Sequence, residues 1–449
     1  MERELFQIDF ENLKQALQQI EKPAHFGVER EGLRVRADGT LSLTPHPAVF
    51  GNKLTAKNIT TDFSESQIEV ITPVCDSIEG AYAALNQLCN RVQKGLPADE
   101  YLWPQSMPCP LPDDGQIPVA YYAGDSPEAK AANAYRQGLL AKYGGKKQML
   151  SGIHFNFSFS DEMIEGLYQQ SRSSRSLQDF KNQLYLKIAR GYLRHRWLVI
   201  YLTGCTPGCH ETYTDACVNA MIHRDDAGYC YQYGGPSIRN SAFGYKNLIP
   251  LFPDYTSVEN FTRDVQRFVN SGQIIAPKEL YTQVRLKPKD PANLIASLQR
   301  DGIQYLELRT LDLNVYDPCG IAGVDMQFLY RFILWLLITP EDDVDDWQAE
   351  ALYNEEAVAL HGFEPDLPLK RAGGWIPFKD WAEEILSEML AMDGAFGTTQ
   401  QPMLITMQAR IRHPEQTYAG KLLTEIETNG TLPMMLDLAA TYKTNATER

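Results

Sequence analysis

The chain has 449 residues, 44% of them hydrophobic, which is enough for a large buried core. It carries 57 acidic and 42 basic residues, a formal net charge of -15, which argues against a nucleic-acid-binding surface and against attraction to an anionic membrane leaflet. Eight cysteines are too sparse for a disulfide scaffold, and the charged N-terminus MERELFQIDF is unlike a signal peptide. The most apolar run, residues 328–338, is interrupted by Arg331 and is too short to span a membrane. We therefore expect a cytoplasmic protein with reduced thiols.

The N-terminal part of the chain combines one helical pattern with strand patterns. Phe10, Leu13, Leu17 and Ile20 recur at helical spacing. From Phe26 the residues alternate in polarity around an Ala-Asp-Gly turn, which indicates a β-hairpin. The expected elements are a helix over 9–21 within an N-terminal segment 1–22, a hairpin over 26–43 with its turn at 37–39, a strand over 68–74 and a helix over 78–96.

The rest of the chain mixes strands with helices of unequal length, which indicates an α+β fold rather than regular βαβ winding. Residues 103–128 are rich in Pro, Gly and Asp and are expected to form a loop, and residues 204–250 are expected to be an irregular insertion. No repeat or linker divides the chain, so we expect one domain over 1–449 with a mainly helical part over 323–449. The other expected elements are helices over 128–142, 176–203, 256–270 and 291–300 and strands over 151–160, 280–287 and 303–313.

Two glutamates on the expected hairpin form the first candidate site. Alternate side chains on a strand share a face, so Glu29 and Glu31 point the same way and Arg30 points the opposite way. A divalent cation relieves the repulsion between two close carboxylates, and carboxylate oxygens suit Mg²⁺. The same pattern also fits a solvated strand face, so both interpretations stay open.

Two further segments place metal-ligating groups beside strands. Asp62, Glu65 and Glu69 lie within eight residues and lead into an apolar strand, which fits either a metal site or a polar loop. In SGIHFNFSFS the phenylalanines occupy one face and His154 the other. The neutral imidazole of His154 is a potential metal ligand, and it equally fits a core histidine with a satisfied hydrogen bond.

Arginines beside acidic or aromatic residues complete the pattern. Glu307 and Arg309 share one face of the strand 303–313, either as an ion pair or as a metal ligand beside a guanidinium that grips phosphoryl oxygens. Metal ligands on separate strands with arginines between them are what phosphoryl transfer to a carboxylate requires. No G-x-x-x-x-G-K-[ST] loop occurs, so a nucleotide would have to bind in another way. Further aromatic and cationic pairs are Tyr135 with Arg136, Arg239 with Tyr245, and Tyr281 with Arg285.

These motifs together resemble the bacterial glutamate–cysteine ligase family, and also the N-terminal module of bifunctional glutathione synthetases. They occur in the family's order between about residues 25 and 320, and a weaker match continues through HPEQTYAGKLL. The resemblance implies a glutamine-synthetase-like carboxylate–amine ligase fold, with a curved, mainly antiparallel sheet and helices outside it. The matching stretches are FGVEREGLRV, TPHPAVFGN, TTDFSESQIEVITP, WPQSMP, AYRQGLLAKYG, KQMLSGIHFNFS, SIRNSAFGY, ELYTQVRLK and GIQYLELRTLDLN.

The resemblance also implies metal ligands and catalytic residues. Arg309 would contact the transferred phosphoryl group, and Arg285 would contact nucleotide phosphates. Glu307 and Arg136 would complete the catalytic set. The metal ligands, which would hold two or more Mg²⁺ ions (or Mn²⁺), would be Glu29, Glu31, Asp62, Glu69, His154 and Glu307.

Two substrate subsites follow from the same resemblance. Arg239 and Gln148 would bind glutamate. The residues expected on the cysteine side are Tyr135, Arg136, Tyr245, Tyr281 and, beside the thiol, Phe63.

The implied reaction is the first step of glutathione synthesis. ATP would phosphorylate the γ-carboxylate of glutamate, and the amine of cysteine would attack the acyl phosphate. The partners would be glutamate, cysteine and ATP, with no nucleic acid or membrane, and the chain would be a monomer or weak homo-oligomer. Three alternatives stay open: a related ligase with another amine acceptor, a dinuclear hydrolase that binds no nucleotide, and a metal-binding regulatory protein without catalysis.

The segment 204–233 departs from the family's pattern. We expect a mobile loop with incidental thiols there, and the alternative is a metal or disulfide site, although the spacing fits no standard zinc motif. No second ATP-binding domain follows, so we expect either a free-standing ligase or a fragment rather than the whole bifunctional enzyme. The residues in question are Cys205, Cys209, His210, Cys217, His223 and Cys230.

Overall fold

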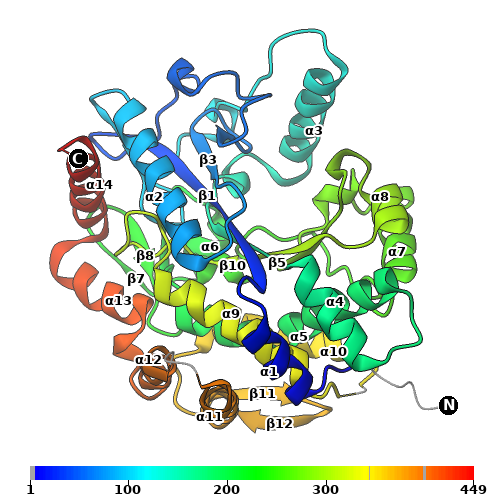
Figure 1. The fold of residues 1–449 in the computed structure, drawn as a ribbon. Helices are drawn as coiled ribbons and strands as arrows, with labels where there is room; N and C mark the ends of the chain where they lie inside the picture. The colour runs from blue at the N-terminus through cyan, green and yellow to red at the C-terminus, as the bar shows by residue number, and fades with distance from the viewer. Residues whose placement is uncertain (1–5, 343, 398–400, 449) are drawn as a thin grey trace.

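The computed structural model describes residues 6–342, 344–397 and 401–448, so parts of the expected segments 1–22 and 323–449 lie outside the described residues. Strands β1, β5 and β10 cross the middle of the molecule, and helices α2, α5 and α9 pack along them (Figure 1). The C-terminal helix α14 lies beside α2, far away in the sequence.

The central sheet has the strand order β2-β3-β1-β5-β10-β9, and β4 pairs with β1 outside this path. All of these strand pairs are antiparallel. The longest strand is β1, which pairs with β3, β4 and β5 and so lies at the centre of the site described below. The strands are β1 (Ala24–Arg36), β2 (Ile59–Thr61), β3 (Gln67–Ile71), β4 (Glu100–Leu102), β5 (Ile153–Phe159), β9 (Val284–Lys287) and β10 (Tyr305–Leu311).

The two faces of this sheet differ in polarity. Alternate residues of the central strands, such as Val28, Phe155 and Leu306, are buried in the main hydrophobic cluster together with α5 and α9. Helix α5 has apolar residues along most of its length, and 19 of its 27 residues are buried, as in a helix surrounded by other elements. The other face of the sheet carries the polar side chains, so the apolar alternation fixes where those side chains point.

The remaining helices lie around this sheet, and within the described ranges none is both long and apolar enough to cross a membrane. Most begin at a Ser, Thr or Asp N-cap. The predicted starts of α1, α2, α3, α5 and α7 lie within two residues of the observed ones. They are α1 (Phe10–Gln19), α2 (Ile78–Gly95), α3 (Pro127–Tyr143), α4 (Asp161–Ser171), α5 (Leu177–Thr203), α6 (Asp215–Ala220), α7 (Val258–Asn270), α8 (Leu294–Asp301), α9 (Gly323–Ile338), α10 (Trp347–His361), α11 (Phe378–Phe396), α12 (Gln401–Arg412), α13 (Tyr418–Asn429) and α14 (Thr431–Glu448).

The predicted α+β class and mainly antiparallel sheet are confirmed, but the hairpin over 26–43 forms only around its turn at 37–39. Only an isolated bridge joins Val35 to Leu41, and β1 pairs along most of its length with β3 and β5 instead. The alternating pattern gave the strand correctly, whereas its partners come from distant segments that a local turn signal cannot identify. The strand expected over 280–287 begins only at Val284.

The segment 204–250 is also more regular than expected. It contains a three-stranded antiparallel sheet of order β6-β8-β7 and the short helix α6. A hairpin formed by β11 and β12 interrupts the mainly helical C-terminal part. The helix α4 was not predicted from the sequence. The strands of these small sheets are β6 (Gly208–His210), β7 (His223–Arg224), β8 (Tyr229–Tyr231), β11 (Pro368–Arg371) and β12 (Gly374–Pro377).

A buried ion pair between β1 and β4 gives a test of the fold. Arg34 is fully buried, and its Nη1 donates to Oε2 of Glu100 at 2.6 Å. We expect Glu100→Ala to lower the free energy of unfolding by about 3–5 kcal/mol, because the guanidinium is left buried without its carboxylate. The matched control is Asp76→Ala, which breaks exposed pairs with Lys22 and His25 and should lower the free energy of unfolding much less than Glu100→Ala does. If urea denaturation gave equal losses of unfolding free energy for Glu100→Ala and Asp76→Ala, this account would be contradicted.

Candidate active site

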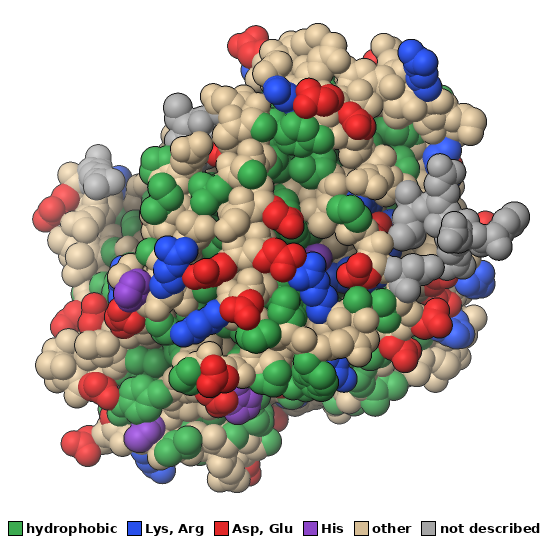
Figure 2. Space-filling view, turned by 90° about the horizontal axis from the view of Figure 1, so that it is seen from below, with side chains coloured by type: hydrophobic (Ala, Val, Ile, Leu, Met, Phe, Trp, Pro, Cys, Tyr) green, Lys and Arg blue, Asp and Glu red, His purple; other side chains and the backbone are tan. Residues whose placement is uncertain are grey.

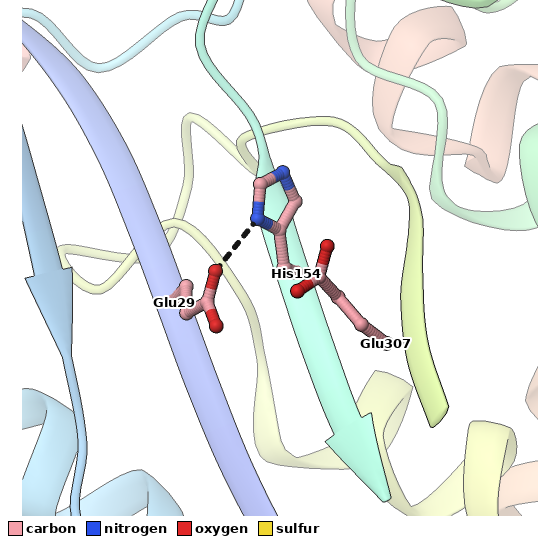
Figure 3. Close-up of side chains that lie close together, drawn as sticks. All are labelled: Glu29, His154 and Glu307. Carbon is pink, nitrogen blue, oxygen red and sulfur yellow. Dashed lines mark hydrogen bonds and ion pairs between the residues drawn. The ribbon is translucent and has the colours of Figure 1, made fainter. Parts of the chain in front are cut away.

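The polar face of the sheet gathers two carboxylates and an imidazole from three strands. Glu29 of β1, His154 of β5 and Glu307 of β10 offer ligand atoms that all lie within 4.8 Å of one another. Figure 3 shows the three side chains over the same patch of the sheet, with the dashed line joining His154 to Glu29. Nδ1 of His154 lies 3.0 Å from Oε2 of Glu29. The strand register causes this, because Glu29 pairs with His154, and Glu307 pairs with Asn156 on the same face.

Three more acids extend this cluster along β1 and β3. Glu31 pairs in register with Glu69, and Oε1 of Glu31 lies 3.5 Å from Nε2 of His154. Asp62 directly follows β2, and its charge acts on both Glu31 and Glu69. The structure thus brings together the whole set implied as metal ligands: Glu29, Glu31, Asp62, Glu69, His154 and Glu307.

One acid of the run 62–69 does not join the cluster. Glu65 forms an ion pair with Lys53 and accepts a backbone hydrogen bond from Tyr121 at 2.9 Å. It therefore holds a loop in place, which is the polar-loop interpretation of that residue.

Burial and mutual repulsion set the charge state of Glu31 and Glu69. Burial, and then the charges of Glu29, Asp62 and other acids, raise the pKa of Glu69 well above its ordinary value. Burial also raises the pKa of Glu31, against the opposing effect of His154. Packing these carboxylates together without a cation is therefore unfavourable.

Glu307 behaves in the opposite way because it is surrounded by cations. Burial acts to raise its pKa, but the charges of Arg309, Lys287 and Arg285 outweigh burial and hold the pKa well below its usual range. Nη1 of Arg309 donates to Oε1 of Glu307 at 2.6 Å, and Nη1 of Arg285 lies 3.5 Å from the same oxygen. Lys287 pairs with the other oxygen, Oε2. Glu307 is therefore an ionised carboxylate at the boundary between the acidic cluster and a cationic group.

The acidic cluster fits a divalent cation. Nε2 of His154 is buried, and it finds no hydrogen-bond partner in the described part of the chain. Several carboxylate oxygens with one imidazole form a donor set that suits Mg²⁺ or Mn²⁺. A cation bound there would offset the repulsion that raises the pKa of Glu69.

A small cavity of about 50 Å³ lies beside the cluster, and its lining includes Arg239, Tyr281 and Arg309. Nη2 of Arg239 donates to the backbone oxygen of Arg309 at 3.2 Å, and Nη1 lies 3.6 Å from Oδ1 of Asp312. Burial lowers the pKa of Arg239, although it remains a guanidinium at any ordinary pH. A larger cavity of about 750 Å³ shares Tyr281 and its neighbour Thr282 with the small one.

A tyrosine pair and Gln148 form the next wall. The hydroxyl of Tyr245 donates to Oε1 of Gln148 at 2.6 Å and also hydrogen-bonds the hydroxyl of Tyr281. Nε2 of Gln148 is buried and has no hydrogen-bond partner within the described ranges. Burial raises the pKa of Tyr245 well above its ordinary value, so this hydroxyl serves as a hydrogen-bonding group and not as a base.

The remaining predicted residues come from α3 and from the loop after β2. Nε of Arg136 donates to the backbone oxygen of Asp62 at 2.7 Å. Burial raises the pKa of Tyr135 to about 12, against its hydrogen bond with Tyr281. Phe63 is 2% exposed and belongs to the second hydrophobic cluster, against which Tyr135 and Tyr281 pack. The predicted substrate residues therefore surround one region next to the acidic cluster.

Sequence analysis missed three charged residues of this region. Lys287 lies two positions after Arg285 on an alternating strand, so its face was predictable. The position of Asp312, the partner of Arg239, was not predictable, because the strand register shifts between residues 308 and 311 of β10. Lys278 lies in a short 3₁₀ helix without a recognisable signal, and its Nζ lies 3.7 Å from the ring centroid of Tyr135.

The cysteines of 204–233 lie in the core of a segment that contains a small sheet and α6, so the expectation of a loop there is wrong. Cys205, Cys209 and Cys217 are fully buried, and the sulfur atoms of Cys209 and Cys217 lie 3.3 Å apart. All eight cysteines are unpaired. Apart from the Glu29 cluster, the residues that the structure describes hold no His, Cys, Asp or Glu group close enough for a metal, so the zinc alternative gains no support.

Comparison with known proteins identifies the family. The family model described as glutamate–cysteine ligase matches residues 7–358, which is most of the chain. The chain belongs to the glutamate–cysteine ligase family. Among curated glutamate–cysteine ligases, that of Clostridium acetobutylicum is 36% identical over 401 residues, which cover 81% of this chain and 83% of that protein.

Bifunctional proteins and solved structures show the same relationship. The bifunctional glutathione biosynthesis protein of Listeria innocua is 37% identical over 440 residues. The chain spans about half the length of such curated relatives, namely 55% of the Listeria innocua protein. The crystal structure of glutamate–cysteine ligase from Francisella tularensis in complex with AMP gives a TM-score of 0.87 at 27% identity, covering 96% of this chain and 90% of that one. The bifunctional glutathione synthetase of Pasteurella multocida gives a TM-score of 0.83 at 33% identity, covering 98% and 54%.

A metal-binding measurement tests the acidic cluster of this family member. We expect Glu29→Gln to weaken Mn²⁺ binding at least about ten-fold, because one charged ligand is lost. The control Glu162→Gln changes an exposed acid on α4 and should leave binding unchanged. Binding should also weaken as pH falls, because the raised pKa of Glu69 lets protons compete with the cation. Calorimetry showing equal affinities for both variants would contradict the assignment.

Proposed function

We propose that the chain is an ATP- and Mg²⁺-dependent ligase that joins the γ-carboxylate of glutamate to the amine of cysteine. One observation carries this proposal. In a chain of the glutamate–cysteine ligase family, Glu29, His154 and Glu307 converge on one face of the sheet, next to a pocket that contains Arg239 and Arg309. Such a site combines ligands for divalent cations with guanidiniums for carboxylate and phosphoryl groups.

Glutamate is proposed to lie between Arg239 and the acidic cluster. The guanidinium of Arg239 can donate two hydrogen bonds to the α-carboxylate in a bidentate arrangement. The unpartnered Nε2 of Gln148 offers a further donor at the same wall. This placement directs the γ-carboxylate toward Arg309, whose Nη1 lies 3.3 Å from Nδ1 of His154.

Cysteine is proposed to lie on the side formed by Tyr135, Arg136, Tyr245 and Tyr281. The hydroxyls there stay protonated because burial raises their pKa values, so they orient the acceptor by hydrogen bonds. Phe63 closes this side with an apolar ring. An amine attacks only in its neutral form, and these hydroxyls are not bases at neutral pH, so the amine of cysteine would have to bind already deprotonated.

The proposed chemistry has two steps. An oxygen of the γ-carboxylate attacks the γ-phosphorus of ATP and ADP leaves, while Arg309 stabilises the transferred phosphoryl group. The amine nitrogen then attacks the acyl carbon, the carbon–oxygen bond to the phosphate breaks, and the nitrogen passes a proton to the departing phosphate as the amide forms. Mg²⁺ held by Glu29, His154 and Glu307 would neutralise negative charge on the triphosphate. Glu307 keeps the guanidinium of Arg309 in place by their 2.6 Å hydrogen bond.

A second candidate is a ligase of the same type with a different amine acceptor. The cavity of about 750 Å³ that shares Tyr281 with the small pocket leaves room for an acceptor larger than cysteine.

We propose the cytoplasm as the working compartment, since all eight cysteines are unpaired and thiols stay reduced there.

The reaction itself is tested by measuring ADP and phosphate release. We expect release to require glutamate, Mg²⁺ and an amine acceptor together, with cysteine the most effective member of a panel of small amino acids and amines. Preference for another amine would favour the second candidate. Metal-dependent hydrolysis without nucleotide, or inactivity with every acceptor, would contradict the proposed function.

The role of Arg239 is tested by substitution. Arg239→Ala should raise the KM for glutamate about 10- to 100-fold, because a charge-assisted contact to a carboxylate is lost. The KM for ATP should change little. Arg263→Ala, at an exposed position on α7, is the control and should leave both constants unchanged. An unaltered KM for glutamate in Arg239→Ala would remove Arg239 from this role.

A further inference from the structure

Lys287 has a position that the proposed reaction has not yet used. It lies at the end of β9, where it pairs in register with Tyr305, two residues along the strands from the pair of Arg285 with Glu307. Its ammonium contacts Oε2 of Glu307 and lies 5.7 Å from the ring centroid of Tyr305. The side chain is 20% exposed, so its charged end reaches the polar face of the sheet while remaining accessible.

The strand register places Lys287 and Arg239 at opposite ends of the acidic cluster. Arg239 packs against Gly152, just before β5 begins, where a Cβ atom would lie 2.0 Å from its Nη2. The backbone nitrogen of Glu31 donates to the oxygen of Gly152, so this end is next to Glu31. Lys287 lies beyond Glu307 at the opposite end, beside the first residue of β10.

This separation matches the geometry of phosphoryl transfer. The attacking oxygen and the departing group lie roughly in line on opposite sides of the transferred phosphorus. If glutamate lies at the Arg239 end, the departing diphosphate must lie at the end of the cluster where Lys287 is found. The inference therefore rests on the proposed function.

Two further atoms at this end support a bound ligand. Nε of Arg285 and Oδ1 of Asn156 are both buried, and neither has a hydrogen-bond partner among the residues described. Asn156 pairs with Glu307 in register, so both atoms flank the carboxylate that Lys287 contacts. Nε of Arg285 is a spare cationic donor, which suits a phosphate oxygen of a nucleotide. Oδ1 of Asn156 is an acceptor, which suits a cation bound with that nucleotide.

We propose that Lys287 binds the β-phosphate of the nucleotide and keeps this contact while ADP is displaced from the transferred phosphorus. A cation bound by Glu307 competes with the ammonium for the carboxylate oxygens and repels it. The flexible lysine stem then lets the ammonium move to the phosphate oxygens, whereas Arg309 stays with the transferred phosphoryl group.

The test compares two lysines that lie two residues apart. Lys287→Met removes the charge and keeps the length of the side chain, and Lys289→Met does the same at an exposed position just beyond β9. By calorimetry on the full chain with Mg²⁺, Lys287→Met should bind ADP about 10- to 100-fold more weakly than the unaltered protein, as expected for a lost charge-assisted contact. Lys289→Met should bind ADP normally, Lys287→Arg should recover part of the affinity, and none should change the affinity for glutamate.

Other outcomes separate this inference from the proposed function. Normal ADP binding by Lys287→Met, or an equal loss of glutamate binding, would show that Lys287 only neutralises Glu307, and would overturn the inference alone. Loss of Mn²⁺ binding in Lys287→Met without a specific effect on ADP would do the same. An unaltered protein that binds ADP but ligates no acceptor would overturn the proposed function and leave the phosphate contact supported. Absence of ADP binding by the unaltered protein would overturn both.

Discussion

Repulsion between buried carboxylates on neighbouring strands is the constraint around which the site is organised. Glu29, Glu31 and Glu69 come from two adjacent strands, and Glu307 comes from a third nearby. A fold could relieve this repulsion by exposing the acids to water, but the apolar alternation of β1 and β5 fixes them on one enclosed face. Glu31 and Glu69 are therefore held where a bound cation or protonation would offset their charges. Glu307, by contrast, is already paired with Arg309 and Lys287, and Glu29 is hydrogen-bonded to His154.

Groups behind the sheet hold the active-site side chains in place. The hydroxyl of Tyr192 on α5 donates to Oγ1 of Thr310 at 2.9 Å, next to Arg309 on β10. One turn further along α5, Arg196 pairs with the buried Glu355, which accepts from Gln283 at 2.7 Å. The helix thus fixes strand β10 and the approach to β9 from the outer side. Such support keeps the reacting groups in register without any of these residues touching a substrate.

Strand alternation in the sequence predicted which side chains share the polar face, whereas the role of these residues as metal ligands was implied by the family resemblance and stays a prediction. His154 sits among phenylalanines, and the same periodicity gives Glu29 with Glu31 and Glu307 with Arg309. The pairing of those strands was not predictable, since the turn expected at Asp38 forms but most of β1 pairs with the distant segments β3 and β5. Asp312 lies after a register shift, and the buried thiols of 204–233 depend on a small sheet whose strands have only two or three residues. Tertiary contacts decide such short elements more than local propensity does.

The central claim is that side chains from separate strands share divalent cations. The most direct measurement is a crystal structure of the protein soaked with Mn²⁺ and recorded at the manganese absorption edge, so that anomalous scattering locates the ions. The account predicts ions on the polar face of the sheet, with Glu29, His154 and Glu307 among their ligands. Ions found only at other surfaces, with these three side chains unchanged and unligated, would contradict it.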